Sequence, residues 1–149
     1  MEKNDIEIIQ MSIDNFEEIK DALITDFDDF WNIDTLKDEL NQSNSLYIIA
    51  KEEKKILGFA GIKIILDEAE LMNIVTKKDS RNCGIASNMI ENIIKYCTKS
   101  GIKKINLEVN IQNSIAINLY KKYNFKEVGR RKKYYNNTDD AILMTLECT

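Results

Sequence analysis

The chain has 149 residues, 44% hydrophobic and 31% charged, a composition that predicts one globular domain over residues 1–149 with its own hydrophobic core. It contains no histidine, which excludes imidazole-based catalytic triads and histidine-ligated zinc, so acid–base chemistry must use carboxylate, Tyr, Lys or Cys groups. The net charge of −4 is unevenly distributed, because residues 1–55 carry 15 acidic and 6 basic side chains and residues 56–149 carry 10 and 15. Two interpretations stay open: the C-terminal part holds an anion and the N-terminal part receives a cation, or both parts are ordinary solvated surface.

Cysteine usage and hydropathy indicate a cytoplasmic protein. Cys83, Cys97 and Cys148 show no CxxC spacing and are interpreted as free thiols, and no metal site is predicted. No apolar run reaches about 18 residues and "MEKNDIEIIQ" lacks a signal-peptide core, so no membrane partner is expected. The overall acidity argues against nucleic acid as a partner, although "RRKK" at 130–133 leaves an RNA contact open. We expect a monomer or a weak dimer.

The first half of the chain predicts a strand, two helices and a hairpin. "DIEIIQMS" alternates as a strand does, and Asp14 is placed to cap a helix over 15–24. The aromatic segment "DFDDFW" is typical of a loop before a second, short helix. The hairpin consists of strands Leu46–Lys51 and Ile56–Leu66, joined by the charged turn "EEKK".

The second half alternates strands and helices. A strand over 68–76 precedes a loop and a helix over 85–100, which has apolar residues at 86, 89, 90, 93, 94 and 97 and ends at Gly101. A strand over 103–109, a helix over 113–123 and strands over 125–136 and 139–147 follow. The order β-α-α-β-β-β-α-β-α-β-β predicts an α/β fold with a mixed sheet and a right-handed parallel crossover.

The loop "RNCGIAS", residues 81–87, connects a strand to the helix with the clearest apolar stripe. Gly84 permits a positive φ, Ala86 leaves the first turn uncrowded, and the free N–H groups of a helix start attract anions. The loop lacks both the GxxxxGK[ST] and the GxGxxG pattern. Taken alone, the pattern favours an ordinary strand-to-helix turn over a phosphate site.

The segment "NLEVNIQNSIAINLYKKYNF", residues 106–125, combines a strand with a helix. Glu108 stands among apolar strand residues, and Tyr120 follows Ala116 by one turn on an apolar stripe. Periodicity alone therefore predicts that Tyr120 is a core residue. Four apolar residues are expected to pack the strand against the helix: Ile105, Leu107, Ile115 and Leu119.

The loop and its neighbours resemble a known family. Arg81, Gly84 and Ala86 match the Arg/Gln-x-x-Gly-x-Gly/Ala pyrophosphate loop of the GNAT superfamily of N-acetyltransferases, and "LMNIVT" and "NSIAINLYKKYNFKEVG" match it in order and spacing. Together with "RRKKYY" they look like the RimI group, which acetylates the N-terminal alanine of ribosomal protein S18. Unlike many relatives, the chain has "TKKDS" in place of an Asp-Pro and no proline after "YY".

The resemblance implies the GNAT fold and direct acetyl transfer from acetyl-CoA. It assigns Glu108 as general base, acting directly or through water, and Tyr120 as general acid toward the coenzyme A thiolate. It implies that Tyr134, Tyr135 and Trp31 contact the acceptor. The residues implied to bind the cofactor are Ile74, Val75, Thr76, Arg81, Asn82, Cys83, Gly84, Ile85, Ala86, Ser87 and Asn113.

The nature of the acceptor follows less directly. An α-amine with a pKa near 8 is partly neutral at pH 7, whereas a lysine amine near 10.4 is neutral in about one molecule in 2,500, so a mild base suffices only for the α-amine. Glu108 would be a stronger base if its neighbours Leu107 and Val109 buried it. Two alternatives stay open: acetylation of a lysine, polyamine or aminoglycoside, and a non-catalytic acyl-CoA-binding module.

Overall fold

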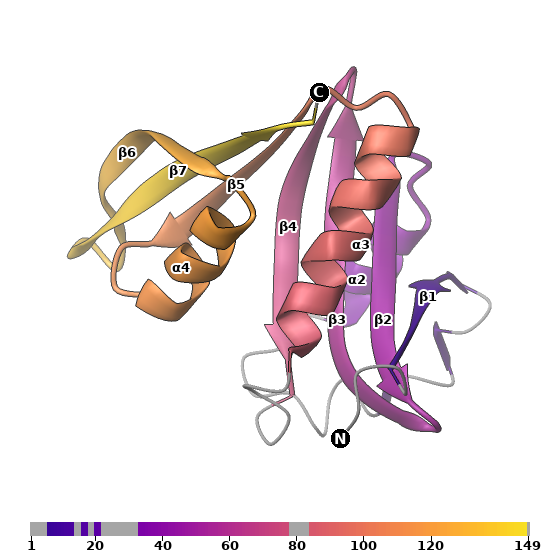
Figure 1. Ribbon diagram of the computed structural model, residues 1–149. Helices are drawn as coiled ribbons and strands as arrows, with labels where there is room; N and C mark the ends of the chain where they lie inside the picture. The colour runs from indigo at the N-terminus through magenta and orange to yellow at the C-terminus, as the bar shows by residue number, and fades with distance from the viewer. Residues whose placement is uncertain (1–5, 14–15, 18–19, 22–32, 78–83, 149) are drawn as a thin grey trace. The chain divides into compact units, whose positions relative to one another are not determined.

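A computed structural model describes residues 6–13, 16–17, 20–21, 33–77 and 84–148. Figure 1 shows an arrangement of strands and helices that follows the predicted alternation. The labelled elements are β1 (Glu7–Met11), α2 (Ile33–Leu40), β2 (Ser45–Glu52), β3 (Lys55–Ile65), β4 (Glu68–Thr76), α3 (Ile85–Lys99), β5 (Lys104–Asn110), α4 (Ser114–Lys122), β6 (Lys126–Tyr135) and β7 (Asp139–Glu147).

The predicted elements are confirmed to within a few residues wherever they fall on described residues. The strand over 68–76 and the strand over 139–147 have the predicted bounds. In the region predicted as the first helix, residues 16–17 and 20–21 are helical. Asp14 and the aromatic segment with Trp31 lie outside the described residues, so those predictions stay predictions.

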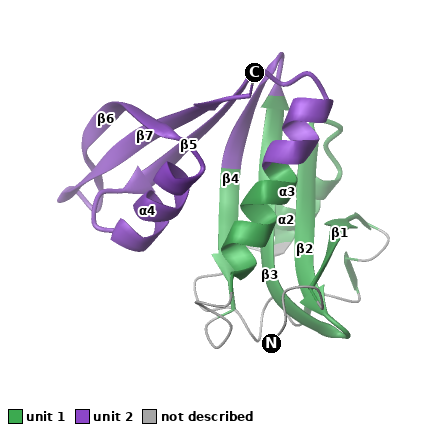
Figure 2. Cartoon of the chain, viewed as in Figure 1, with its two compact units in different colours: residues 1–64, 72–93 green, residues 65–71, 94–149 purple. Residues whose placement is uncertain are grey.

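Two compact units make up the chain, residues 1–64 with 72–93 and residues 65–71 with 94–149 (Figure 2). In the first unit, β2 pairs antiparallel with both β1 and β3. Its core includes the fully buried Leu36 of α2, Tyr47 of β2 and Phe59 of β3. The prediction that residues 1–149 form one domain stays a prediction.

The second unit is built on the start of β4 and on β5, β7 and β6. Glu68–Glu70 of β4 pair parallel with residues 104–106 of β5, which confirms the predicted parallel pairing, while the right-handed crossover stays a prediction. β5 and β6 both pair antiparallel with β7. Among the described residues the strand order is β1-β2-β3-β4-β5-β7-β6, so the α/β mixed-sheet prediction is confirmed.

Local sequence signals explain several boundaries. Gly101, two residues after the end of α3, has a φ of 77°, as a helix-ending glycine should. Asn136 and Asn137 both have positive φ in the turn between β6 and β7, a conformation that asparagine tolerates well. Among the described residues, no helix has the length and apolarity needed to cross a membrane.

Candidate active site

Strand β5 divides its side chains between two environments. Ile105, Leu107 and Val109 are buried, whereas Asn106 and Glu108 alternate with them and face the open side. Glu108 is two residues past Asn106, which makes the last recorded pair between β4 and β5. The expectation that Leu107 and Val109 bury Glu108 is wrong, because alternation sends their side chains to the opposite face. The carboxylate is thus accessible beside the point where β4–β5 pairing ends.

Arg131 of β6 is the ionic partner of Glu108. Its Nη2 lies 3.1 Å from Glu108 Oε1, and the side chains keep 55% and 31% of their exposure. The guanidinium carbon also lies 5.4 Å from the centre of the Tyr134 ring. This pair was not predicted from the sequence, because it depends on the register in which β7 pairs with Glu108 through Leu143 and with Arg131 through Ala141.

Tyr120 of α4 is a core residue, as periodicity predicted. It is 5% exposed, and its ring centre lies 5.7 Å from that of Phe125. Burial, together with the nearby Tyr135, raises the pKa of Tyr120 to about 12. The prediction that Ile115 packs between strand and helix is wrong, because Ile115 is 80% exposed and so lies on the solvent side of α4.

The paired tyrosines connect these groups. The rings of Tyr134 and Tyr135 meet edge to face, with centres 5.2 Å apart. Burial, followed by the charge of Glu108 and by Tyr134, raises the pKa of Tyr135. Because Tyr135 also contributes to the raised pKa of Tyr120, it lies within electrostatic range of both Glu108 and Tyr120. Tyr135 thus interacts electrostatically with the accessible Glu108 carboxylate and, separately, with the buried Tyr120. A carboxylate and a phenol hydroxyl are groups that suit proton transfer and hydrogen bonding to a polar reaction centre.

The residues implied to bind the cofactor fall in both units and are described for each separately. In the first unit, Ile74, Val75 and Thr76 are half-buried residues of β4. Gly84 has the predicted positive φ, 79°, and its carbonyl accepts the first helical hydrogen bond, from the Asn88 N–H at 3.0 Å. Arg81, Asn82 and Cys83 lie outside the described residues.

The start of α3 offers backbone donors. Ile85, Ala86 and Ser87 occupy its first turn, where N–H groups have no intrahelical acceptor and suit an anion such as a pyrophosphate. In the second unit, Asn113 caps α4, since its Oδ1 accepts a hydrogen bond from the Ala116 N–H at 3.2 Å. Asn113 therefore has a structural role as a helix cap, and its cofactor contact stays a prediction.

Gly58 of β3 holds the first turn of α3 close to the sheet. A Cβ at this position would lie 2.8 Å from the Val75 carbonyl oxygen and 3.1 Å from Ile85 Cγ2. Only glycine permits this approach. Gly58 was not singled out from the sequence, because its role depends on contacts with two other elements.

A metal-based site finds no support in the described part of the chain. There, no group of three or more His, Cys, Asp or Glu side chains is placed to hold an ion.

Comparison with known proteins gives consistent matches. The model of the Acetyltransferase (GNAT) family matches residues 16–125. The [ribosomal protein bS18]-alanine N-acetyltransferase of Haemophilus influenzae is 36% identical over 120 residues, covering 76% of this chain and 80% of that protein. The crystal structure of the ribosomal-protein-S18-alanine N-acetyltransferase from Escherichia coli has a TM-score of 0.86 at 26% identity, covering 97% and 94% of the two chains.

A more distant structure shares the fold alone. Arabidopsis thaliana NAA60, crystallised in complex with acetyl-CoA, has a TM-score of 0.80 at 19% identity and covers 95% of this chain and 98% of its own.

Proposed function

The chain belongs to the acetyltransferase (GNAT) family, and we propose that it acetylates the N-terminal α-amine of a protein, namely the alanine of ribosomal protein bS18. As a family member it is an N-acetyltransferase that uses acetyl-CoA. The choice of acceptor is supported by the relatives at 36% and 26% identity, which bear that activity in their names.

The observation that supports the mechanism is that Tyr135 interacts electrostatically with the accessible Glu108 carboxylate and with the buried Tyr120. Glu108 is the general base: it takes a proton from the acceptor ammonium, directly or through one water, and leaves the neutral amine to attack the thioester carbonyl. An α-amine needs only a mild base, because its ordinary pKa lies near neutrality. This supports an α-amine over a lysine side chain.

Tyr120 acts on the leaving group. When the carbon–sulfur bond breaks, negative charge develops on the sulfur of coenzyme A, and a phenol hydroxyl can donate a hydrogen bond to it. The raised pKa of Tyr120 keeps that hydroxyl protonated at neutral pH, so the donor is always present. Direct transfer from cofactor to amine requires no acyl-enzyme, and Cys83 has no covalent role.

Acetyl-CoA and the acceptor would be bound by different residues. The first turn of α3 and the loop before it would hold the pyrophosphate of acetyl-CoA through backbone N–H groups. Tyr134 and Tyr135 would line the acceptor side, with Trp31 as a further contact. A cytoplasmic location, a monomer or weak dimer, and the absence of a nucleic-acid partner stay predictions.

An acceptor panel tests the proposal. The purified protein is incubated with acetyl-CoA and an Ala-initiated bS18 peptide, a lysine peptide with a blocked N-terminus, spermidine or an aminoglycoside, and the mass gain is located by tandem mass spectrometry. We expect acetylation of the α-amine with a kcat/KM at least tenfold above the others. Preference for a side-chain amine would replace the bS18 proposal, and coenzyme A binding without any turnover would favour the non-catalytic module.

Glu108→Gln separates the role of the base from binding. It should lower kcat on the peptide by about 10²- to 10⁴-fold, the usual contribution of general base catalysis, and leave the affinity for acetyl-CoA unchanged. Glu53→Gln, in the turn between β2 and β3, is the matched control and should keep the wild-type rate. A Glu108→Gln enzyme within threefold of wild type would remove Glu108 from the mechanism.

A further inference from the structure

The second unit contains a polar groove on the open face of its sheet, separate from the residues assigned to catalysis. Its cavity measures about 500 Å³. We define the polar groove by six of its lining residues: Glu68, Lys104, Asn106, Lys126, Thr145 and Glu147. They come from β4, β5, β6 and β7, four strands of one unit, so the groove does not depend on how the two units are arranged.

The floor of the polar groove is a chain of hydrogen bonds. Thr145 Oγ1 donates to Asn106 Oδ1 at 2.7 Å, and Asn106 Nδ2 donates to Glu68 Oε1 at 2.8 Å. All three side chains are partly buried. The chain therefore ends on a carboxylate whose orientation is held by a neighbour, and a carboxylate retains acceptor sites for further donors. Such a group suits a cationic side chain that can donate hydrogen bonds.

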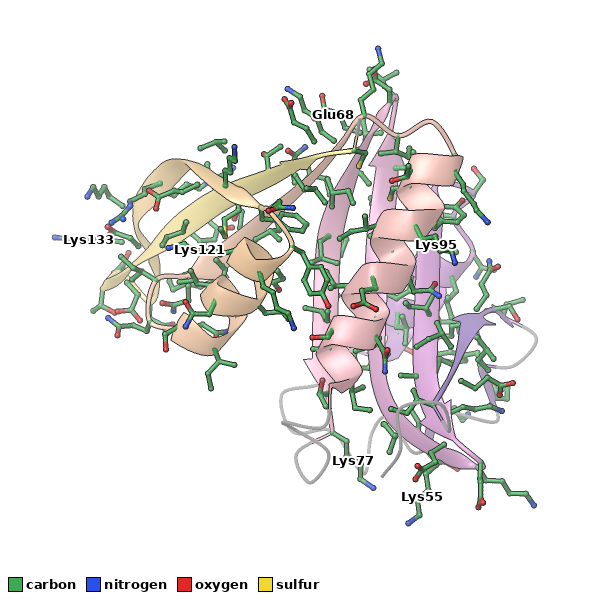
Figure 3. The ribbon with its side chains drawn as sticks, viewed as in Figure 1. Lys55, Glu68, Lys77, Lys95, Lys121 and Lys133 are labelled. Carbon is green, nitrogen blue, oxygen red and sulfur yellow. The ribbon has the colours of Figure 1, made fainter. Side chains whose placement is uncertain are left out.

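The rim of the polar groove is charged and more exposed. Lys104, Lys126 and Glu147 are solvent-exposed strand residues, with long side chains that can adjust to a ligand. Figure 3 shows Glu68 at the end of this unit's sheet opposite to Lys133, so the groove lies away from the turn between β6 and β7. A ligand that lies along these strands would contact Glu68 at the end of the sheet opposite to Lys133.

The polar groove lies within a few residues of Glu108 along β5. Asn106 and Glu108 are two residues apart on the same face of β5, about 6.6 Å, and Lys104 lies about 13 Å from Glu108 at about 3.3 Å per residue. On the other side, Arg131 contacts Glu108 and lies over Tyr134. An extended peptide that has its amine at Glu108 and runs along β5 toward Lys104 would have its third residue beside Asn106 and its fifth beside Lys104.

We propose that the polar groove binds the third to fifth residues of the acceptor polypeptide and that Glu68 accepts hydrogen bonds from a Lys or Arg side chain there. The inference rests on the proposed function, because it takes Glu108 as the position of the acceptor amine. The groove thereby selects acceptors by sequence beyond their first residue. A free amino acid is too short to reach from Glu108 to Glu68, so the groove favours longer acceptors such as polypeptides.

Peptide kinetics test the position and the partner together. The substrates are octapeptides that begin with Ala and otherwise consist of Ser and Gly. One Arg is placed at each position from 2 to 7 in turn, and a matched peptide carries Gln at the same position. We expect Arg at positions 3 to 5 to raise kcat/KM about tenfold over Gln, through KM, as a charged hydrogen bond permits. Glu68→Gln should reduce that advantage to less than twofold, whereas the control Glu53→Gln should keep the advantage and leave the rate on the Gln peptides unchanged.

A binding experiment with a peptide that cannot be acetylated tests the polar groove separately from the proposed function. The N-acetylated octapeptide with Arg at its fifth position, which cannot react, is titrated into the isotope-labelled wild-type protein with coenzyme A, and amide shifts are followed by NMR. Shifts at 104–106 and 145–147 support the groove even if no peptide is acetylated, an outcome that would refute the proposed function alone. Shifts confined to other residues, or an Arg advantage that survives in Glu68→Gln, would overturn the groove proposal.

Discussion

Replacing Tyr120 by Phe removes one hydroxyl and keeps the ring that packs near Phe125. We expect kcat to fall by about 10²- to 10³-fold, the loss measured when one preorganised donor to a developing anion is removed. The affinity for acetyl-CoA and the stability of the fold should change little, because the aromatic contact remains. Tyr96→Phe, at an exposed position of α3, is the matched control and should leave kcat unchanged.

The pKa of Tyr120 also indicates which role its hydroxyl has in the proposed mechanism. With the pKa of Tyr120 near 12 and that of a free thiol near 8.5, complete proton transfer to the thiolate is unfavourable by about 5 kcal/mol. A hydrogen bond to the developing charge avoids that transfer. The hydroxyl is protonated at every pH well below 12, so kcat should show no alkaline decrease between pH 8 and 10 that depends on Tyr120.

The assay is a coenzyme A release assay under saturating substrates from pH 6 to 10, for wild type, Tyr120→Phe and Tyr96→Phe. Two results would refute the reasoning. One is a Tyr120→Phe kcat within threefold of wild type. The other is a wild-type decrease above pH 8.5 that disappears in Tyr120→Phe, which would mean that the hydroxyl ionises far below its expected pKa.

Three further predictions follow from buried positions. Gly58→Ala should raise the KM for acetyl-CoA at least fivefold, because the added Cβ displaces the first turn of α3. The control Gly129→Ala should keep the wild-type KM, because its added Cβ makes an ordinary contact at 3.4 Å. Equal KM values in the two variants would contradict this prediction. Gly61→Ala should lower the free energy of unfolding, measured in urea, by about 3 kcal/mol, because the added Cβ overlaps the fully buried ring of Tyr47; a loss below 1 kcal/mol would show that the ring can move. Burial raises the pKa of Cys97 from 9.0 to about 12, so the contribution of its neutral thiol to the free energy of unfolding is present below pH 9 and is lost as the pH rises toward 12. Between pH 8 and 10.5 the free energy of unfolding of wild type should fall by about 2 kcal/mol more than that of Cys97→Ala. Equal decreases in the two proteins would contradict this prediction.

Much of the fold could be predicted from the sequence because its signals are local. The apolar stripe of α3 and the alternation in β4 and β7 set element type, and Gly101 and Asn113 mark helix ends through their own conformations and hydrogen bonds. Ile115 was misplaced for a physical reason. A short helix has several apolar residues around its axis, and only the tertiary contact decides which of them faces the sheet.

The candidate site could be predicted only in part. Glu108 and Tyr120 were named through the family resemblance, and periodicity alone gave Tyr120 a purely structural role. Arg131 and the chain from Thr145 to Glu68 were missed, because these contacts join residues far apart in sequence. Such partners depend on strand register, which no local pattern specifies.

The division of β5 into a buried face and an open face has a consequence for engineering. Residues such as Asn106 and Thr145 contribute to the open side, while alternate positions such as Leu107 and Met144 build the core. Substitutions at exposed positions of the open side, such as Lys104 and Glu147, should be tolerated by the fold, whereas Asn106 and Thr145 share a partly buried hydrogen bond. Libraries restricted to the exposed positions could therefore test the proposed acceptor preference without a search for compensating stabilising changes.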